Sequence, residues 1–489
     1  MNTSLRGATW ALLALCPLAY LACGDSSSGG SATTDIDAAT ATPTGDAATT
    51  TTDAGDAATD ASADADADAA PPTLVTVTAI TSSKLPEANA NVVFYDNAGA
   101  VLGTTLTDAM GKATREMPAG GQVTVVFGTT TRPNLVSIQG VQGGDNLTAL
   151  DPARIGTTRF VVTPPAAAFP NATSLSIHIG SCVVSTPVAG GNSNSIPPAR
   201  CTPFDVATVV LVAQAANGAA LATSALQNVQ LVSGTTTVAF TNAWTAVGAN
   251  VTSTATNVPA MGAVSQVPNT NTFALTQGLG TNDMISTSNG NAPLASSSPT
   301  SSSVFAPFYP APAFLQNEAD VFEETNDFSA LVTRAVVTRS TAAANPSIDF
   351  STALPAISST TVTGTTVPTV TWVSNSPLTA TKGIVAYSSW FQKGQSGTWL
   401  VLAPPSATTI TPPALPTALT AYGPSGNFQS PVLVAAVDAT FLPDYATTRA
   451  SAALLTPQMN LVQGNFAAVV PPLPVDGTLK LTAFGANSD

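Results

Sequence analysis

The single histidine of this 489-residue chain is the first candidate for acid–base chemistry. A catalytic histidine needs a nucleophile and an orienting acid close by, and no Gly-x-Ser-x-Gly turn is present in the sequence. Leu175, Ile177 and Ile179 alternate along a predicted strand and share one of its faces. His178 lies between them in the sequence and therefore falls on the opposite face. We therefore expect a solvent-facing strand histidine rather than a catalytic one.

The densest acidic group of the C-terminal half could supply paired carboxylates, which glycosidases use. Its members are Glu318, Asp320, Glu323, Glu324 and Asp327. Residues three or four apart would share one face of a short helix, and Phe322, Phe328 and Leu331 could bury the other face. The alternative is a solvated helix face or strand edge. Glu323 and Glu324 are kept as a possible ligand surface.

Three tryptophans, Trp372, Trp390 and Trp399, lie close together in the sequence. Aromatic rings on an open sheet can bind sugar rings, whereas rings inside a sandwich fill its core. Trp399 shares a strand face with Val401 and is predicted to be core. Trp390 lies near a predicted hairpin tip and is the best candidate among the three for an exposed ligand surface, although core packing is the favoured prediction for it as well.

The cysteines predict one disulfide. Cys16 lies in the N-terminal apolar segment, which leaves Cys23 and the pair Cys182 and Cys201. An even pair in an exported chain favours a Cys182–Cys201 bridge, which is worth about 3 kcal/mol for a loop of roughly twenty residues. Two free buried thiols are the alternative. One histidine and one bridge leave too few ligands for a zinc site, so we expect no metal and no cofactor.

The N-terminus has the features of an export signal. Arg6 precedes an apolar stretch over residues 8–18 that is too short to cross a membrane as a helix. The following Leu21-Ala22-Cys23 resembles the lipobox of bacterial lipoproteins, with Tyr20 where that pattern has an aliphatic residue. The resemblance implies a signal peptide over 1–22 and a palmitate-bearing lipid anchor on Cys23. Ordinary signal cleavage near Ala22 is the alternative.

Negative charge is concentrated in the segment that follows Cys23. Ten of the 28 acidic residues lie between residues 23 and 70, where there is no Lys or Arg. With almost no large apolar residues, residues 23–71 are predicted to be a disordered Ser/Thr/Ala/Asp linker. The rest of the chain is nearly neutral, which argues against a nucleic-acid partner because phosphate binding needs clustered Lys and Arg.

Composition predicts an all-β chain with two or three β-sandwich modules. Only 9% of residues are charged, against about 25% in typical globular proteins, and short Thr- and Val-rich runs alternate between turns. The predicted modules are residues 72–130, a second β module over 131–262 with the disulfide, a loop-rich connection over 263–345 with the acidic segment, and a C-terminal β module over 346–489.

The first module carries a recognisable set of turn and strand residues, namely Asp96, Thr107, Asp108, Gly111, Ala113, Pro118, Ala119 and Gly120. In this order they resemble the pattern of the carboxypeptidase regulatory-like domain. The resemblance implies a small transthyretin-like β sandwich over about 72–130 that acts as an accessory module without catalysis. Within it, Asp108 and Gly111 are predicted to make a turn, with Asp108 as a turn cap rather than a metal ligand, and Val123 and Val125 are predicted to face the core.

The sequence therefore favours a membrane-tethered, extracytoplasmic lipoprotein with a non-enzymatic binding or structural role. We expect it in the cell envelope, at the outer membrane or cell surface, with the membrane as one partner through the lipid and a glycan or envelope protein as another. The alternative function is a secreted hydrolase that acts on carbohydrate and carries β accessory domains.

Overall fold

The structure is a computed structural model. It describes residues 73–179, 182–198, 201–202, 204–246, 250–257, 269–278, 284–286, 292–293, 301–307, 316–327, 330–341, 347–364, 366–392, 394–424, 432–455 and 477–486. The chain divides into residues 1–67 and 68–489, and all of the described residues belong to the second unit.

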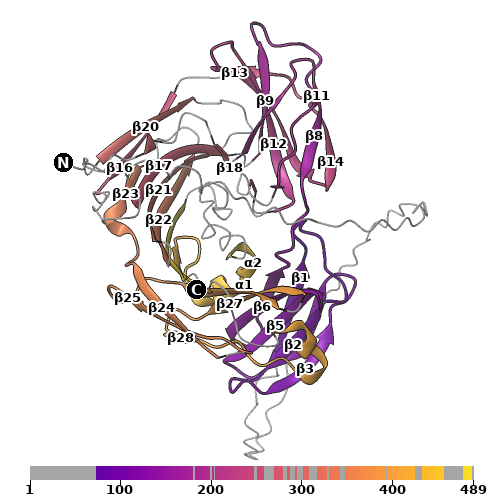
Figure 1. Cartoon of the computed structure of the whole chain (residues 1–489), viewed down its shortest axis with the longest axis vertical. Helices are drawn as coiled ribbons and strands as arrows, with labels where there is room; N and C mark the ends of the chain where they lie inside the picture. Colours follow the sequence, from indigo (N-terminus) through magenta and orange to yellow (C-terminus); the bar gives the residue numbers. More distant parts are fainter. Residues whose placement is uncertain are drawn as a thin grey trace, which may run out of the picture. The chain divides into compact units, whose positions relative to one another are not determined.

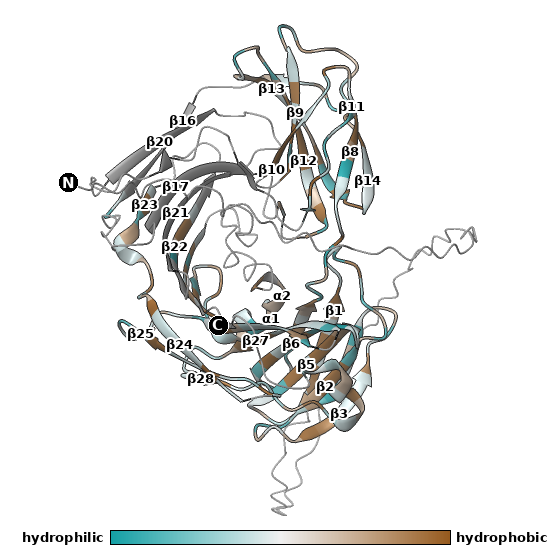
Figure 2. Cartoon of the chain, viewed as in Figure 1, coloured by the Kyte–Doolittle hydropathy of each residue, from teal (hydrophilic) through white to brown (hydrophobic). Residues whose placement is uncertain are grey.

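The described chain is built almost entirely of strands, with short helices near its C-terminal end (Figure 1). The predicted all-β class is confirmed. Figure 2 shows hydrophobic stretches along strands such as β5, β9 and β12, which carry buried Val, Ile and Leu residues. Among the described residues, no helix has the length and apolar character needed to cross a membrane.

The N-terminal sandwich sets a three-stranded sheet against part of a much larger one. The small sheet has the order β4 (Lys112–Glu116), β1 (Leu74–Ile80) and β7 (Asn146–Leu150), with β1 and β7 parallel. Val75 and Val77 of β1 pack in one core with Val123 and Val125 of β5. The predicted core positions of Val123 and Val125 are confirmed.

The large sheet has 13 strands. Twelve follow one another in the order β18 (Met284–Ser286), β17 (Asn269–Gly278), β21 (Gln316–Asp327), β22 (Ala330–Thr341), β30 (Gly477–Ala486), β29 (Val432–Ala439), β26 (Gly383–Gln392), β27 (Gln395–Ala403), β6 (Arg132–Val141), β5 (Gly121–Thr129), β2 (Asn91–Tyr95) and β3 (Val101–Leu106), and β19 (Ala292–Pro293) pairs with β17. The step from β27 to β6 is parallel and joins segments far apart in the sequence.

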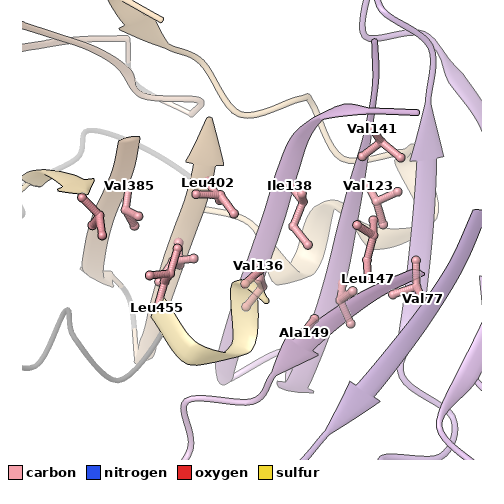
Figure 3. Close-up of a cluster of buried hydrophobic side chains, with 14 of the residues drawn as sticks. Val77, Val123, Val136, Ile138, Val141, Leu147, Ala149, Val385, Leu402 and Leu455 are labelled. Atoms are coloured by element: carbon pink, nitrogen blue, oxygen red, sulfur yellow. The ribbon is translucent and has the colours of Figure 1, made fainter. Parts of the chain in front are cut away.

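The middle of the large sheet is buried on both faces. On one face, Val136, Ile138, Val385 and Leu402 share the first core with the small sheet and with Leu455 of α2 (Ala452–Leu455) (Figure 3). On the other face is a second core, shared with the sheet of β24 (Ile357–Thr363), β25 (Thr369–Ser374) and β28 (Thr409–Ile410). The central strands are therefore rich in Val, Ile, Leu and Ala rather than strictly alternating.

A second, separate sandwich carries the disulfide. Its five-stranded sheet has the order β10 (Cys182–Thr186), β9 (Ser174–Ile179), β12 (Val206–Gln214), β13 (Ala220–Gln230) and β15 (Thr245–Ala246). It packs on a sheet of β11 (Gly191–Asn192), β8 (Thr158–Thr163) and β14 (Gly234–Ala239). The core between the two sheets contains Phe160, Ile177, Leu211 and Phe240.

The remaining elements are short. A three-stranded sheet has the order β20 (Ser301–Pro307), β16 (Asn250–Thr256) and β23 (Ser347–Asp349). The 3-10 helices η2 (Phe350–Thr352) and η3 (Thr417–Tyr422) are also described, and the α-helix α1 (Tyr445–Ala450) precedes α2.

Helix α1 is fastened to the first sandwich by polar contacts. Asp444 caps the helix by accepting a hydrogen bond from the Thr447 backbone N–H at 2.8 Å. Arg449 makes a bidentate ion pair with Asp145, with Nε–Oδ2 and Nη2–Oδ1 distances of 2.5 and 2.9 Å. Tyr445 donates its hydroxyl to the Gln139 carbonyl at 2.7 Å. Helix α1 is thus tied directly to β6 and to the turn between β6 and β7.

The strand pairing bears on the predicted module boundaries without testing them. β6 begins just after residue 130 and pairs with both β5 and β27, so hydrogen bonding crosses from the predicted first module to the predicted last one. The boundaries at 130, 262 and 345 stay predictions.

Candidate functional site at the disulfide-linked junction

The predicted bridge between Cys182 and Cys201 is present, with the sulfur atoms 2.12 Å and the Cα atoms 5.1 Å apart. Cys182 opens β10, and Cys201 lies in the loop that leads into β12. The Cys201 side chain is buried in the core of the second sandwich. The bridge therefore fixes the start of the segment that reaches Asp205.

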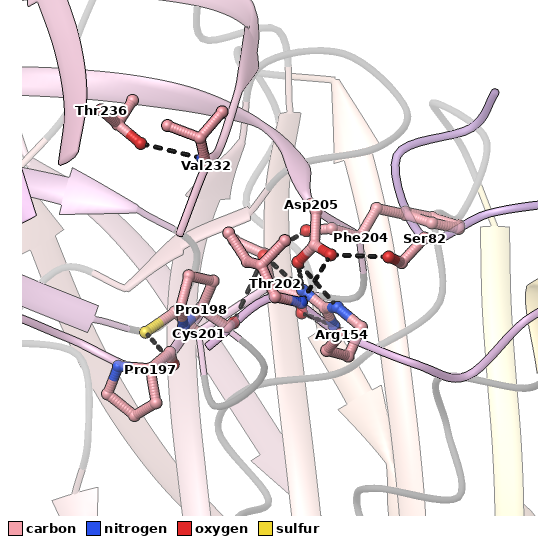
Figure 4. Close-up of polar contacts among 11 residues, drawn as sticks. Ser82, Arg154, Pro197, Pro198, Cys201, Thr202, Phe204, Asp205, Val232 and Thr236 are labelled. Carbon is pink, nitrogen blue, oxygen red and sulfur yellow. Dashed lines mark hydrogen bonds and ion pairs between the residues drawn. The ribbon is translucent and has the colours of Figure 1, made fainter. Parts of the chain in front are cut away.

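Asp205 is fully buried just beyond the bridge, and both of its carboxylate oxygens accept hydrogen bonds (Figure 4). Oδ1 accepts from Nε of Arg154 at 2.9 Å. Oδ2 accepts from the Ser82 hydroxyl at 2.6 Å and from the Ile155 backbone N–H at 3.0 Å. A buried carboxylate is tolerated only when it is paired and hydrogen-bonded in this way.

Arg154 completes the pair from the segment between the two sandwiches. Its Nη2 lies 2.8 Å from Oδ1 of Asp205, and its Nη1 donates to the Thr202 carbonyl at 2.8 Å. The Arg154 side chain is only 9% exposed. The guanidinium thus binds both the Asp205 carboxylate and a backbone carbonyl of the loop that follows Cys201.

Backbone contacts extend the junction into both sandwiches. The Asp205 N–H donates to the Ser82 carbonyl, and the Leu231 N–H donates to the Asp205 carbonyl, each at 2.8 Å. Lys84 places its Nζ 4.3 Å from the centre of the Phe204 ring, a cation–π contact. The loop after β1 is therefore joined to the segment before β12 by an ion pair, backbone bonds and a ring contact.

This arrangement suits mechanical coupling better than catalysis. A general base needs an oxygen that can reach a substrate proton, whereas both Asp205 oxygens are occupied by buried protein donors. No group of three or more metal-ligating side chains occurs among the described residues. We call the contacts among Ser82, Arg154, Thr202 and Asp205 the junction clamp.

Sequence reasoning missed the clamp, although one signal for it exists. Asp205 is the single acidic residue between Asp151 and Asp283. It stands directly before the apolar strand β12 and shortly after Cys201. An isolated acid next to a core strand and a bridged cysteine predicts a buried, paired carboxylate. Its partner Arg154 could not be identified, because 51 positions separate the two residues.

The turn predicted at Asp108 and Gly111 is confirmed. Oδ1 of Asp108 accepts hydrogen bonds from the backbone N–H groups of Met110 and Lys112, both at 2.8 Å. Gly111 has φ +71°, and a Cβ there would collide with the Ala79 carbonyl. Asp108 is thus engaged as a turn cap, which is the role that the sequence favoured over metal binding.

Trp390 is not the exposed aromatic that its place near a hairpin tip suggested. Its side chain is 2% exposed and packs in the second core beside Trp399. Its Nε1 donates to Oε1 of Gln395 at 3.1 Å. The cause is the small residue opposite it, since Gly397 pairs with Trp390 and leaves room for the ring. The favoured prediction of core packing is confirmed, and so is the core position of Trp399 with Val401.

The acidic segment forms a strand rather than the short helix considered from the sequence. Residues 316–327 make up β21, in which Glu323 pairs with Arg334 and Glu324 with Thr333 of β22. The carboxylate spacing matches a helix face, but the whole segment pairs in register with β22, and this pairing makes it a strand. The side chains of Glu323 and Glu324 lie outside the described residues, so a ligand surface there stays a prediction.

His178 is buried rather than solvent-facing, at 4% exposed. It lies on β9 between Val183 of β10 and Val210 of β12, and its Nε2 is 3.1 Å from the Ser176 hydroxyl oxygen. Alternation identified the apolar face correctly, since Ile177 and Ile179 are core. It could not show that the second face of this strand is also buried.

Cys23, the predicted lipid site, lies outside the described residues, as do the predicted signal peptide and linker. Their placement stays a prediction. The alternative of ordinary cleavage near Ala22 also stays open.

Comparison with known proteins gives no family. No family model matches the chain, and no curated protein matches it, so the resemblance to the carboxypeptidase regulatory-like domain stays a prediction. Among solved structures, the chain is similar to the TIE protein of Bacillus anthracis, with 11% identity, a TM-score of 0.15, and 57% of this chain and 49% of that one covered. The match thus spans about half the length of that protein.

Two pilins give similar values. The shaft pilin SpaA of Lactobacillus rhamnosus GG has 9% identity and a TM-score of 0.13, with 35% of this chain and 99% of that one covered. A minor pilin of Streptococcus agalactiae has 11% identity and a TM-score of 0.14, with 36% and 97% covered. Likenesses this weak carry no argument about the function of the present chain.

Proposed function

We propose that this chain is an exported lipoprotein, anchored through Cys23, whose β modules have a structural or binding role in the cell envelope and no catalytic one. The observation that carries the proposal is the Cys182–Cys201 disulfide. Disulfides form and persist in oxidising compartments outside the cytoplasm. The bridge therefore supports export, which the N-terminal signal pattern independently predicts.

The junction clamp supports a structural role. Its buried ion pair and backbone bonds join segments of two sandwiches instead of lining an open site. A protein held by a lipid at one end of an acidic linker benefits from modules that stay joined when the chain is pulled. The hydrolase alternative rests on Glu323 and Glu324 and gains no support from the described side chains.

The test is a comparison of the wild-type protein with Cys23→Ser in the same Gram-negative expression host. We expect the wild type to incorporate labelled palmitate and to fractionate with membranes, because several acyl chains give a stable anchor. We expect Cys23→Ser to lose the label and to become soluble outside the cytoplasm with its disulfide intact. Cys16→Ser is the matched control and should behave as the wild type.

Two results would contradict the proposal. Unchanged membrane association of unlabelled Cys23→Ser would exclude the lipid as the anchor. Free thiols at Cys182 and Cys201 in freshly isolated protein would remove the support for export.

A further inference from the structure

An open groove of about 540 Å³ lies beside Trp372, the first of the three tryptophans in the C-terminal half. It is formed by the end of β25, the loop before β26 and the loop between β27 and β28. Its lining includes Trp372, Pro405, and the hydroxyl residues Thr379, Ser406 and Thr408, and none of the lining residues carries a charge. The volume falls within the range of about 300–1,000 Å³ typical of small-molecule sites.

Trp372 differs from the other described tryptophans in its hydrogen bonding. The indole N–H groups of Trp244, Trp390 and Trp399 donate to Ala167 O, Gln395 Oε1 and Ser137 Oγ, at 2.9, 3.1 and 2.9 Å. Within the described part of the chain, the Trp372 N–H makes no hydrogen bond. A buried tryptophan N–H usually finds a hydrogen-bond partner; the N–H of the half-buried Trp372 has none in the described protein and is available to a ligand.

The Trp372 ring is also held in place. It is half-buried and packs against the second core, together with Leu378 and Ala407. The same residue lines the groove. A side chain already packed against the core loses little conformational entropy when a ligand binds to it.

Hydroxyl groups surround the ring. Thr379, Ser406 and Thr408 are exposed, and their hydroxyls make no hydrogen bond within the described residues. Ser374 and Thr381 donate their hydroxyls to the carbonyls of Ser376 and Leu378, at 2.8 and 2.9 Å, and their oxygens can still accept. The groove thus offers an aromatic face with both donors and acceptors and no charge.

We propose that this groove is a binding site for a neutral glycan. A pyranose ring has an apolar C–H face that can lie on the Trp372 indole, and equatorial hydroxyls that can exchange hydrogen bonds with the indole N–H, Thr379, Ser406 and Thr408. An acidic glycan finds no cation in the lining, and its desolvated charge would be left unpaired there.

The proposal goes beyond the role proposed above. Its test uses purified protein in detergent, so it stands or fails separately from the lipid anchor. Calorimetric titration of the full-length protein with cellohexaose, maltohexaose and chitohexaose tests neutral glycans. An oligogalacturonate of similar length tests acidic glycans, and decaproline tests a proline-rich peptide as the alternative occupant.

We expect binding of at least one neutral hexaose and none of the oligogalacturonate. Trp372→Ala should weaken that binding about tenfold or more, a loss of about 1.4 kcal/mol, and Trp372→Phe should weaken it less because stacking is kept. Phe391→Ala is the matched control, because Phe391 is an exposed aromatic on β26 outside the groove. It should bind as the wild type does.

The double variant Thr379→Val and Thr408→Val removes two hydroxyls at nearly constant volume and provides a second readout if Trp372→Ala does not fold. It should also weaken binding. The proposal is overturned if none of the three neutral hexaoses binds, if decaproline binds instead of them, or if binding persists unchanged in the folded groove variants.

Discussion

At the scale of single residues, the acidic side chains of the described chain serve mainly to hold its backbone. Oδ1 of Asp96 accepts hydrogen bonds from two backbone N–H groups, and Asp151, Asp349 and Asp444 each cap one nearby N–H. Hydrogen bonds from Thr447 lower the pKa of Asp444 below its usual value. A chain with few charges therefore uses them as turn and helix caps, which are common at such positions.

Tyr95 shows the opposite situation, a buried polar group without a partner. Its side chain is fully buried and its hydroxyl has no hydrogen-bond partner. The nearby Thr124 side chain lowers the pKa of Tyr95, but by less than burial raises it. Burial raises the pKa of Tyr95 to about 12, because the phenolate cannot be solvated in the core.

The variant Tyr95→Phe should accordingly be neutral or stabilising by up to about 1 kcal/mol at pH 8, because it removes an unsatisfied hydroxyl. In the wild type, the unfolded chain releases the Tyr95 proton above pH 10 whereas the folded chain keeps it. The wild type should therefore lose stability between pH 10 and about 12, and Tyr95→Phe should lose less. Urea unfolding of both proteins at pH 8 and pH 11 measures this. An equal loss in both would show that Tyr95 is not responsible.

At the scale of elements, the β26–β27 hairpin depends on a glycine under a tryptophan. Gly397 lies opposite Trp390, and a Cβ at this position would overlap the six-membered ring of that indole. Gly394, in the turn of the same hairpin, has φ +80° and open space where a Cβ would point. The two glycines are required for different reasons, one for volume and one for backbone conformation.

Gly397→Ala should therefore destabilise the protein by about 1–3 kcal/mol, the usual effect of overpacking a core. Gly394→Asn should change stability by less than about 1 kcal/mol, because asparagine tolerates positive φ in hairpin turns. The measurement is urea unfolding followed by tryptophan fluorescence, to which Trp390 contributes together with the other tryptophans of the chain. Equal stability of the two variants would mean that the indole ring can move aside at little cost.

The same elements show what the sequence could and could not predict. The strand over 174–179 and the core position of Trp399 follow from alternation, and the bridge follows from the count of cysteines. The burial of His178 and Trp390 depends on what covers a second face or lies across a strand, which alternation does not contain. The clamp is the extreme case, since Arg154 and Asp205 meet only after two sandwiches have formed.

At the scale of the whole molecule, two kinds of connection join segments that are distant in the sequence. β6 and β27 pair in parallel within the large sheet, with Thr398 aligned with Asn134 and Leu402 with Ile138. The junction clamp connects the loop after β1 to the second sandwich through a few polar groups instead. Pairing within the sheet is spread over many backbone hydrogen bonds, whereas the clamp consists of one buried ion pair and the few hydrogen bonds around it.

Because the clamp has so few interactions, its loss should destabilise the second sandwich without destabilising the large sheet. Asp205→Asn keeps the side-chain volume but leaves Arg154 buried without its counter-charge, which typically costs about 3–5 kcal/mol. Because Asp205 contributes little to the large sheet, we expect hydrogen exchange to accelerate about a hundredfold or more in β9 and β12, with β5 and β26 nearly unchanged. Hydrogen exchange followed by mass spectrometry, with the disulfide kept oxidised, measures both regions in one experiment.

The control for this experiment is an ion pair that is partly exposed. Nζ of Lys480 lies 3.7 Å from Oδ2 of Asp438, and the two side chains are 25% and 18% exposed. Lys480→Met should lower the free energy of unfolding by less than about 1 kcal/mol. Faster exchange in all four strands of Asp205→Asn would mean that the sandwiches unfold as one unit, and no change in β9 and β12 would mean that the ion pair does not fasten the second sandwich. Faster exchange in β9 and β12 alone is the result expected if the clamp, and not the large sheet, joins the second sandwich to the rest of the chain.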